Sequence, residues 1–93
     1  MIEFTEWATQ ILRRAHEAAR RFDPEVTVRL SRSADGVEFA LADAPEPGDR
    51  IVRGDGFELL VEPGLDGIVD VVEPHDRLIL RPPGSKERSV RPH

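Results

Sequence analysis

The sequence predicts a mainly β protein that carries one helix near its N-terminus. A helical pattern of apolar residues occurs once, over residues 5–22. From residue 26 onward, apolar residues instead alternate with polar ones in short runs, which is typical of strands. Turns rich in glycine and proline separate these runs, so about six to seven short strands are expected. Because only one helical crossover is available, a doubly wound parallel sheet is excluded.

The predicted helix covers about Thr5–Phe22. Thr5 is a suitable N-cap, and Glu6 follows it where the helix dipole favours an acidic side chain. The helix should end at Asp23, because the residue before a proline disfavours helical backbone. One stripe is apolar and should pack on the sheet: Ala8, Ile11, Leu12, Ala15, Ala18, Ala19 and Phe22. The other face should be exposed and holds Gln10, Arg13, Arg14, Glu17, Arg20 and Arg21.

Two half-buried strands should follow the helix, joined by a loop over Ser31–Gly36. A linker over Ala44–Asp49 comes next, since two prolines so close together cannot sit in a central strand. The inward-facing residues of the two strands should be Val26, Val28 and Leu30, then Val37, Phe39 and Leu41.

The stretch Pro47–Val72 contains the strands around which the rest of the chain is organised. Ile51 and Val52 lie on its first strand, and Asp55-Gly56 supplies a turn in which glycine accepts a positive φ. Its other two strands should span Phe57–Val61 and Ile68–Val72, and a final short strand should follow at Leu78–Leu80. We therefore expect a single domain over residues 1–83 and a flexible polar tail over residues 84–93.

Composition narrows the class of protein further. The chain has 93 residues, of which 39% are hydrophobic, as in an ordinary water-soluble domain. No apolar run approaches the roughly 18 residues that span a bilayer, and the N-terminus does not resemble a signal peptide, so a cytoplasmic protein is expected. The formal net charge of −5 argues against nucleic acid or an anionic membrane as a partner. Without cysteine there is no disulfide, thiolate nucleophile or thiolate metal ligand.

A family resemblance rests on short motifs taken in order. They are Ile2–Ala8, Val28–Leu30, Pro47–Asp49, Asp55-Gly56, Leu60-Val61, Leu65–Val72 and Leu78–Pro83. Together they resemble the HesB/IscA domain, the A-type iron–sulphur carrier family, over nearly the whole chain. The resemblance implies a β pseudobarrel or sandwich with one helix, and a link to iron–sulphur cluster assembly.

The chain departs from that family at the cluster ligands. Carriers of the family use three cysteines, one in the loop after the second strand and two near the C-terminus. Here these regions read Ser31–Gly36 and Ser85–Ser89, and neither contains a thiol. A serine hydroxyl is too basic and too hard to replace a thiolate on iron. We therefore expect no cofactor, no metal and no catalytic residue carried over from the family.

After these exclusions, the sequence is compatible with two classes of function. The favoured one is an accessory domain that does not bind a cluster and acts by contacting another protein, such as assembly machinery, or by self-association. The alternative is a small-molecule or metal-binding module that uses Asp and His. An enzyme is not expected, because no motif places a nucleophile or a general base.

Several residues admit both a structural and a functional interpretation. Asp70, His75 and Asp76 could form a hard-metal site, although a solvated turn is the favoured interpretation. Trp7 could anchor a partner but is expected to cap the core, and His16 should simply be exposed. Turn chemistry is expected for Asp35, Asp43 and Asp49. An acidic partner could bind the basic helix face, which otherwise is solvated: Arg13, Arg14, Arg20 and Arg21.

Overall fold

The computed structural model describes residues 2–34, 36–73 and 77–85, and these form one helix and seven strands. The elements are, in chain order, β1 (Ile2–Phe4), α1 (Glu6–Phe22), β2 (Thr27–Ser33), β3 (Gly36–Ala42), β4 (Arg50–Gly54), β5 (Phe57–Val61), β6 (Gly67–Val72) and β7 (Arg77–Arg81). The predicted class, mainly β with one N-terminal helix, is confirmed.

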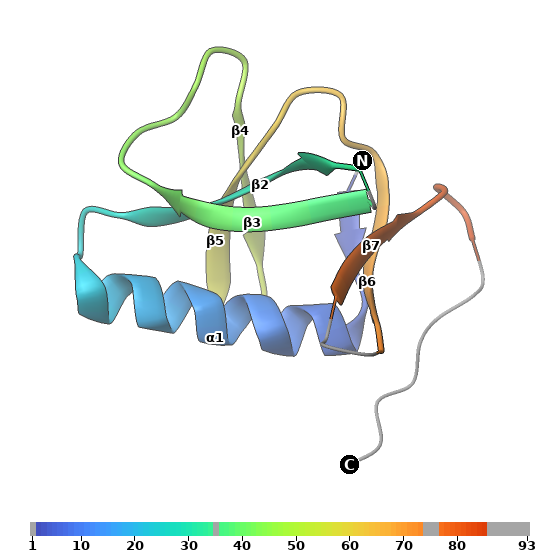
Figure 1. The fold of residues 1–93 in the computed structure, drawn as a ribbon, viewed down its shortest axis with the longest axis horizontal. Coiled ribbons are helices and arrows are strands. Elements are labelled where there is room, and N and C mark those ends of the chain that lie inside the picture. Colours follow the sequence, from blue (N-terminus) through green and yellow to red (C-terminus); the bar gives the residue numbers. More distant parts are fainter. Residues whose placement is uncertain (1, 35, 74–76, 86–93) are drawn as a thin grey trace.

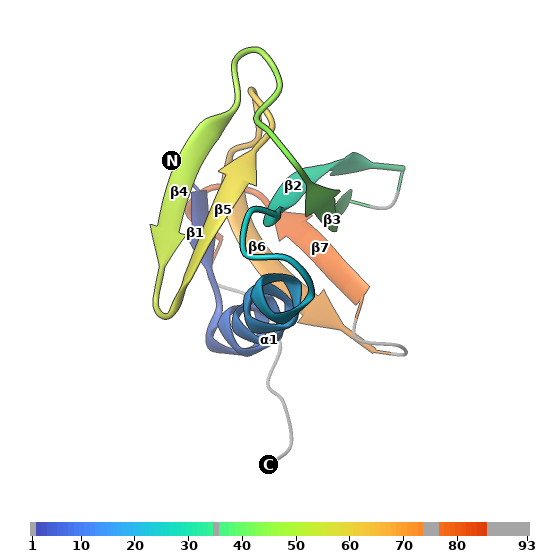
Figure 2. The same cartoon turned by 90° about the vertical axis from the view of Figure 1, so that its left-hand side faces the viewer.

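The strands form two sheets that stand over α1, which runs along one side of the molecule (Figure 1). The larger sheet has the order β3-β2-β5-β4, with β2 and β5 parallel and the other pairs antiparallel. The smaller sheet has the order β1-β6-β7, in which β1 pairs parallel with β6. Viewed nearly along the helix, β7 crosses behind β3 and brings the two sheets together on that side (Figure 2).

The helix begins and ends where the sequence predicts. Thr5 is the N-cap, and its Oγ1 accepts a hydrogen bond from the backbone N–H of Ala8 at 3.2 Å. Asp23 caps the other end by donating its backbone N–H to the carbonyl of Ala19. Leu12 is fully buried, but Phe22 is 77% exposed and Ala18 is also exposed, so the predicted places of Phe22 and Ala18 in the packed stripe are wrong. No helix of the described residues is long and apolar enough to span a bilayer.

The core lies between α1 and the central strands of both sheets. Its largest fully buried apolar side chains are Leu12, Leu30, Leu59, Leu65, Ile68, Val28, Val61, Val69 and Val71. The strand β6 is buried from Gly67 to Val71, which explains why its sequence is nearly continuously apolar and does not alternate. Phe4 and Phe57 add an edge-to-face contact with ring centroids 5.2 Å apart, and this contact packs β1 against β5.

The hairpin of β2 and β3 is longer than predicted. Pairing extends to Ser33↔Gly36, so the loop expected over Ser31–Gly36 is wrong and most of it is strand. The sequence missed this because Ser31, Arg32 and Ser33 carry no apolar alternation, yet their backbone pairs with β3. Of the predicted tail, Gly84 lies in a turn after β7 that the Ser85 N–H closes by donating to the Pro82 carbonyl, and residues 86–93 lie outside the described part of the chain.

The turn at Asp55-Gly56 has the predicted backbone, with a φ of 85° at Gly56. A Cβ added at Gly56 would lie 2.6 Å from Nε of Arg13. The same Nε and an Nη of Arg13 donate hydrogen bonds to the carbonyl of Asp55, so this helix residue holds the β4–β5 turn. Arg13 is therefore not simply a solvated member of the basic face.

Replacing Gly56 with valine is expected to cost more than about 1 kcal/mol of unfolding free energy, because β-branched residues are strained at positive φ. The matched control is Gly64→Val, since Gly64 has a similar φ of 89° but no atom within 4 Å of an added Cβ. Urea denaturation of both variants should show the larger loss at Gly56. A near-neutral Gly56→Val would show that the turn is built differently, and equal losses would mean that the Arg13 contact adds nothing.

Candidate binding groove between α1 and β3

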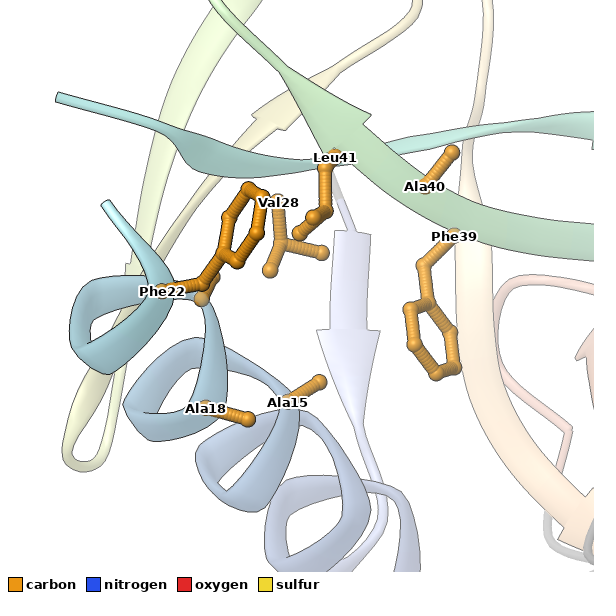
Figure 3. Close-up of a pocket in the computed structure, with 8 residues that line it drawn as sticks. Ala15, Ala18, Phe22, Val28, Phe39, Ala40 and Leu41 are labelled. Carbon is orange, nitrogen blue, oxygen red and sulfur yellow. The ribbon is translucent and has the colours of Figure 1, made fainter. Parts of the chain in front are cut away.

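An apolar groove of about 470 Å³ opens between the C-terminal halves of α1 and β3 (Figure 3). Val28 of β2 is fully buried and forms its floor. The walls include three large apolar side chains that remain exposed, Phe22 at 77%, Leu41 at 53% and Phe39 at 41%. The complete lining is Ala15, Ala18, Ala19, Phe22, Val28, Phe39, Ala40 and Leu41.

The strand register explains why the β3 side of the groove is apolar. Leu30 lies opposite Phe39 and Val28 lies opposite Leu41, so both β3 side chains share a face with buried core residues. The alternation in the sequence therefore assigned the correct face to Phe39 and Leu41, but the expectation that they are covered is wrong. On α1 the facing residues are mostly alanines, whose small side chains leave space that a larger residue would fill.

The groove stays open because β7 covers only the first part of β3. A Cβ at Gly36 would lie 3.1 Å from Cα of Ile79 and 3.3 Å from the backbone nitrogen of Leu80. Val37, next to this crossing, is buried. Among the described residues, β3 pairs only with β2, and its other edge is unpaired along the whole strand. An inward-facing sheet surface is thus left without the layer that would normally bury it.

Basic side chains flank the groove on its helix side. Arg14, Ala18 and Arg21 are spaced at i, i+4 and i+7, so they lie along one side of α1, and Ala18 lines the groove. Arg14 and Arg21 are exposed, and their side chains make no ion pair or hydrogen bond with any other described residue. The arginines of the predicted basic face therefore do not all have the same surroundings. Arg13 donates hydrogen bonds to the β4–β5 turn, whereas Arg14 and Arg21 are exposed beside the groove.

A partly buried ion pair joins β2 to the connection between β3 and β4. Arg29 donates from Nε and Nη2 to the two carboxylate oxygens of Asp49, at 2.8 and 2.9 Å. The backbone N–H of Glu46 also donates to Asp49. The hydrogen bonds from Arg29 lower the pKa of Asp49, and the same pairing raises the pKa of Arg29. Asp49 does sit in a turn as expected, but no local pattern around it indicates its partner on β2.

The lowered pKa of Asp49 predicts an acid-sensitive contribution to stability. A carboxylate with a depressed folded-state pKa stabilises the protein above the ordinary carboxyl value of about 4, and this contribution disappears as pH falls through the lower, folded-state value. The difference in unfolding free energy between wild type and Asp49→Asn should therefore be largest at neutral pH and shrink on acidification. Urea titrations at several pH values measure it, with exposed Asp43→Asn as control. A difference that does not change with pH would contradict the pairing.

Asp70 of β6 is a second buried carboxylate, and its oxygens accept hydrogen bonds from other residues of the protein. Its Oδ1 accepts hydrogen bonds from Thr5 Oγ1 at 2.9 Å and from the Val71 N–H at 2.8 Å, and its Oδ2 accepts from Arg81 Nε at 2.7 Å. The guanidinium already supplies the positive charge that a metal would bring. His75 and Asp76, the other two residues of the suggested metal site, lie outside the described residues. Within those described, no group of three or more His, Asp or Glu side chains could hold a metal ion.

Two other residues singled out in the sequence take structural positions. Trp7 is buried in the core cluster, in agreement with the expectation that it caps the core. His16 is only partly exposed, so the expectation that it is simply exposed is wrong, and its Nδ1 is buried with no hydrogen-bond partner among the described residues.

Comparisons with known proteins do not place the chain in a family. No protein-family model, no curated protein and no solved structure matches it. The HesB/IscA resemblance consequently remains an expectation drawn from short motifs, and the groove has to be interpreted from its own chemistry.

Proposed function

We propose that this protein is a protein-binding domain and that the groove between α1 and β3 is its binding site. The observation that carries the proposal is the convergence of three exposed large apolar side chains, Phe22, Phe39 and Leu41, around a buried floor. Covering such a surface removes apolar area from water and is favourable in proportion to that area. Contiguous apolar patches bordered by charge are typical of protein interaction sites.

The chemistry of the lining favours a protein partner over a small molecule. Pockets for small ligands usually combine an apolar lining with a few polar groups that fix the ligand's orientation. Every side chain that lines this groove is alanine, valine, leucine or phenylalanine. Apolar side chains of another protein need no such polar groups. The same lining supplies no nucleophile or general base, so we propose binding and not catalysis at this site.

The resemblance to HesB/IscA domains suggests a setting for this binding. In that setting the protein is a cytoplasmic accessory domain that contacts iron–sulphur assembly proteins without carrying a cluster itself. The motif order supports the setting, and the absence of cysteine supports the lack of a cluster.

Binding by the groove is tested with variants of its wall. Immobilised wild type and Leu41→Asp are exposed to native lysate, and captured proteins are quantified. Ile51→Asp is the matched control, because Ile51 is a 63% exposed apolar residue on β4, at the opposite edge of the larger sheet. Proteins held by wild type and Ile51→Asp but lost by Leu41→Asp support the proposal. Identical capture by all three would contradict it, and the identity of the captured proteins tests the link to cluster assembly.

Anaerobic reconstitution with iron and sulphide is expected to leave the protein colourless and free of iron after desalting. A cluster needs anionic sulphur donors, and the chain has none. A second copy would bring no thiol either. Absorption spectra and iron analysis measure the outcome. Stoichiometric iron and sulphide with visible charge-transfer bands would contradict the expectation.

A further inference from the structure

We propose that the occupant of the groove is an extended segment of an acidic partner protein, which pairs with the free edge of β3 as an added strand. This inference rests on the proposed function and specifies how the same site binds. In the complex, alternate apolar side chains of the segment would cover the groove, and acidic residues beside them would meet Arg14 and Arg21.

The first support is the edge of β3. This strand ends the larger sheet, so alternate backbone N–H and C=O groups point away from β2. Natural proteins usually protect such edges with charged residues, proline or a covering element. The opposite edge, β4, follows this rule with Arg50 and Arg53, whereas Phe39–Ala42 contains neither charge nor proline. The part of β3 that carries the groove is therefore also its least protected part.

The second support is the match between strand geometry and the groove. A strand added beside β3 would lie about 4.8 Å away, and every second side chain would point to the same face as Phe39 and Leu41. These side chains would enter the space between β3 and α1 (Figure 3). Because β7 crosses β3 at Gly36, only a short segment opposite Phe39–Ala42 can pair, which leaves room for about two apolar anchors.

The third support is the charge beside the groove. Arg14 and Arg21 have no partner among the described residues and lie along the side of α1 next to the groove. They would attract acidic side chains that flank the apolar anchors. A second copy of this chain fits less well, because a two-fold arrangement of β3 edges would bring the same arginines of both copies to one face.

The experiment selects ligands from a library of random linear peptides displayed on phage, using the full chain as bait. The expected ligands carry two apolar residues at alternate positions with Asp or Glu beside them. Their affinity should fall about 30-fold with Leu41→Asp and also with Phe22→Gln, which changes the other wall. Arg14→Glu combined with Arg21→Glu should weaken binding about fivefold or more, whereas Arg20→Glu, on the far side of α1, should not.

Strand pairing has its own readout. In a selected peptide, N-methylation of one set of alternate backbone amides should abolish binding, because those amides face β3. N-methylation of the other set should leave binding unchanged. The amides of Phe39–Ala42 should also gain protection from hydrogen exchange. Peptides with apolar residues at helical spacing, or insensitivity to N-methylation, would overturn strand addition while leaving the groove as the binding site. Ligands that bind Leu41→Asp and Phe22→Gln as well as wild type would instead overturn the proposed function.

A second copy as occupant is detected independently by sedimentation. The wild type is expected to be monomeric at micromolar concentration. A wild-type dimer that becomes monomeric with Leu41→Asp would show that the groove is filled by another copy, and this result would overturn the acidic partner.

Discussion

Replacing Asp70 with alanine is expected to lower the unfolding free energy by about 3–5 kcal/mol, which for a domain of this size removes a large part of the total. Asp70 is fully buried, and its loss would remove the carboxylate that accepts a hydrogen bond from Nε of Arg81, whose side chain is only 18% exposed. Thr5 would lose the acceptor of its hydroxyl hydrogen at the start of α1. Breaking one half of a buried pair is costly because the remaining charge stays desolvated.

Urea denaturation at neutral pH measures this effect. Asp43→Ala is the control, because Asp43 is exposed and its replacement should change stability by less than about 0.5 kcal/mol. Replacing Asp70 and Arg81 together by apolar residues should cost less than replacing Asp70 alone, since the guanidinium charge is then removed along with its Asp70 acceptor. A loss below about 1 kcal/mol for Asp70→Ala would mean that the carboxylate behaves like an exposed one.

The second large effect is expected at Leu12, where replacement by alanine should cost about 3 kcal/mol of unfolding free energy. Leu12 is fully buried between α1 and the sheets, so shortening it leaves a cavity that a packed core closes only in part. The control is Arg14→Ala, an exposed position on the same helix with no partner among the described residues. Arg13 is unsuitable as a control because it holds the Asp55 carbonyl. Equal losses at Leu12 and Arg14 would contradict the assigned face of the helix.

The features that the sequence predicted correctly are those set by neighbouring residues. The Thr5 cap, the end of α1 at Asp23 and the positive φ at Gly56 all follow from local backbone preferences. Strand identity along β5 and β6 follows from apolar alternation and continuity, which again are local patterns. Such local patterns indicate on which face of a helix or strand a side chain lies.

The candidate site could not be predicted from the sequence, because the exposure of a side chain depends on which elements cover it. The local pattern indicates only the face of the helix or strand on which the side chain lies. Phe22, Phe39 and Leu41 have the spacing of core residues, and nothing in that spacing reveals that they stay exposed. The weak signals available were the alanines of α1 and the unprotected run Phe39–Ala42. The partners of Asp49 and Asp70 were equally hidden, since each lies on a distant strand or at the start of the helix.

The hydrogen bond from Thr5 to Asp70 has a consequence for how the chain folds. It joins residues that are 65 positions apart, and the parallel pairing of β1 with β6 spans the same separation. Contacts of such high sequence separation form only after a long loop has closed, which slows folding relative to a chain with local contacts. During synthesis, the smaller sheet can assemble only once β6 has left the ribosome. Until then, the start of α1 has its own Thr5 cap but lacks the strand that holds it in place.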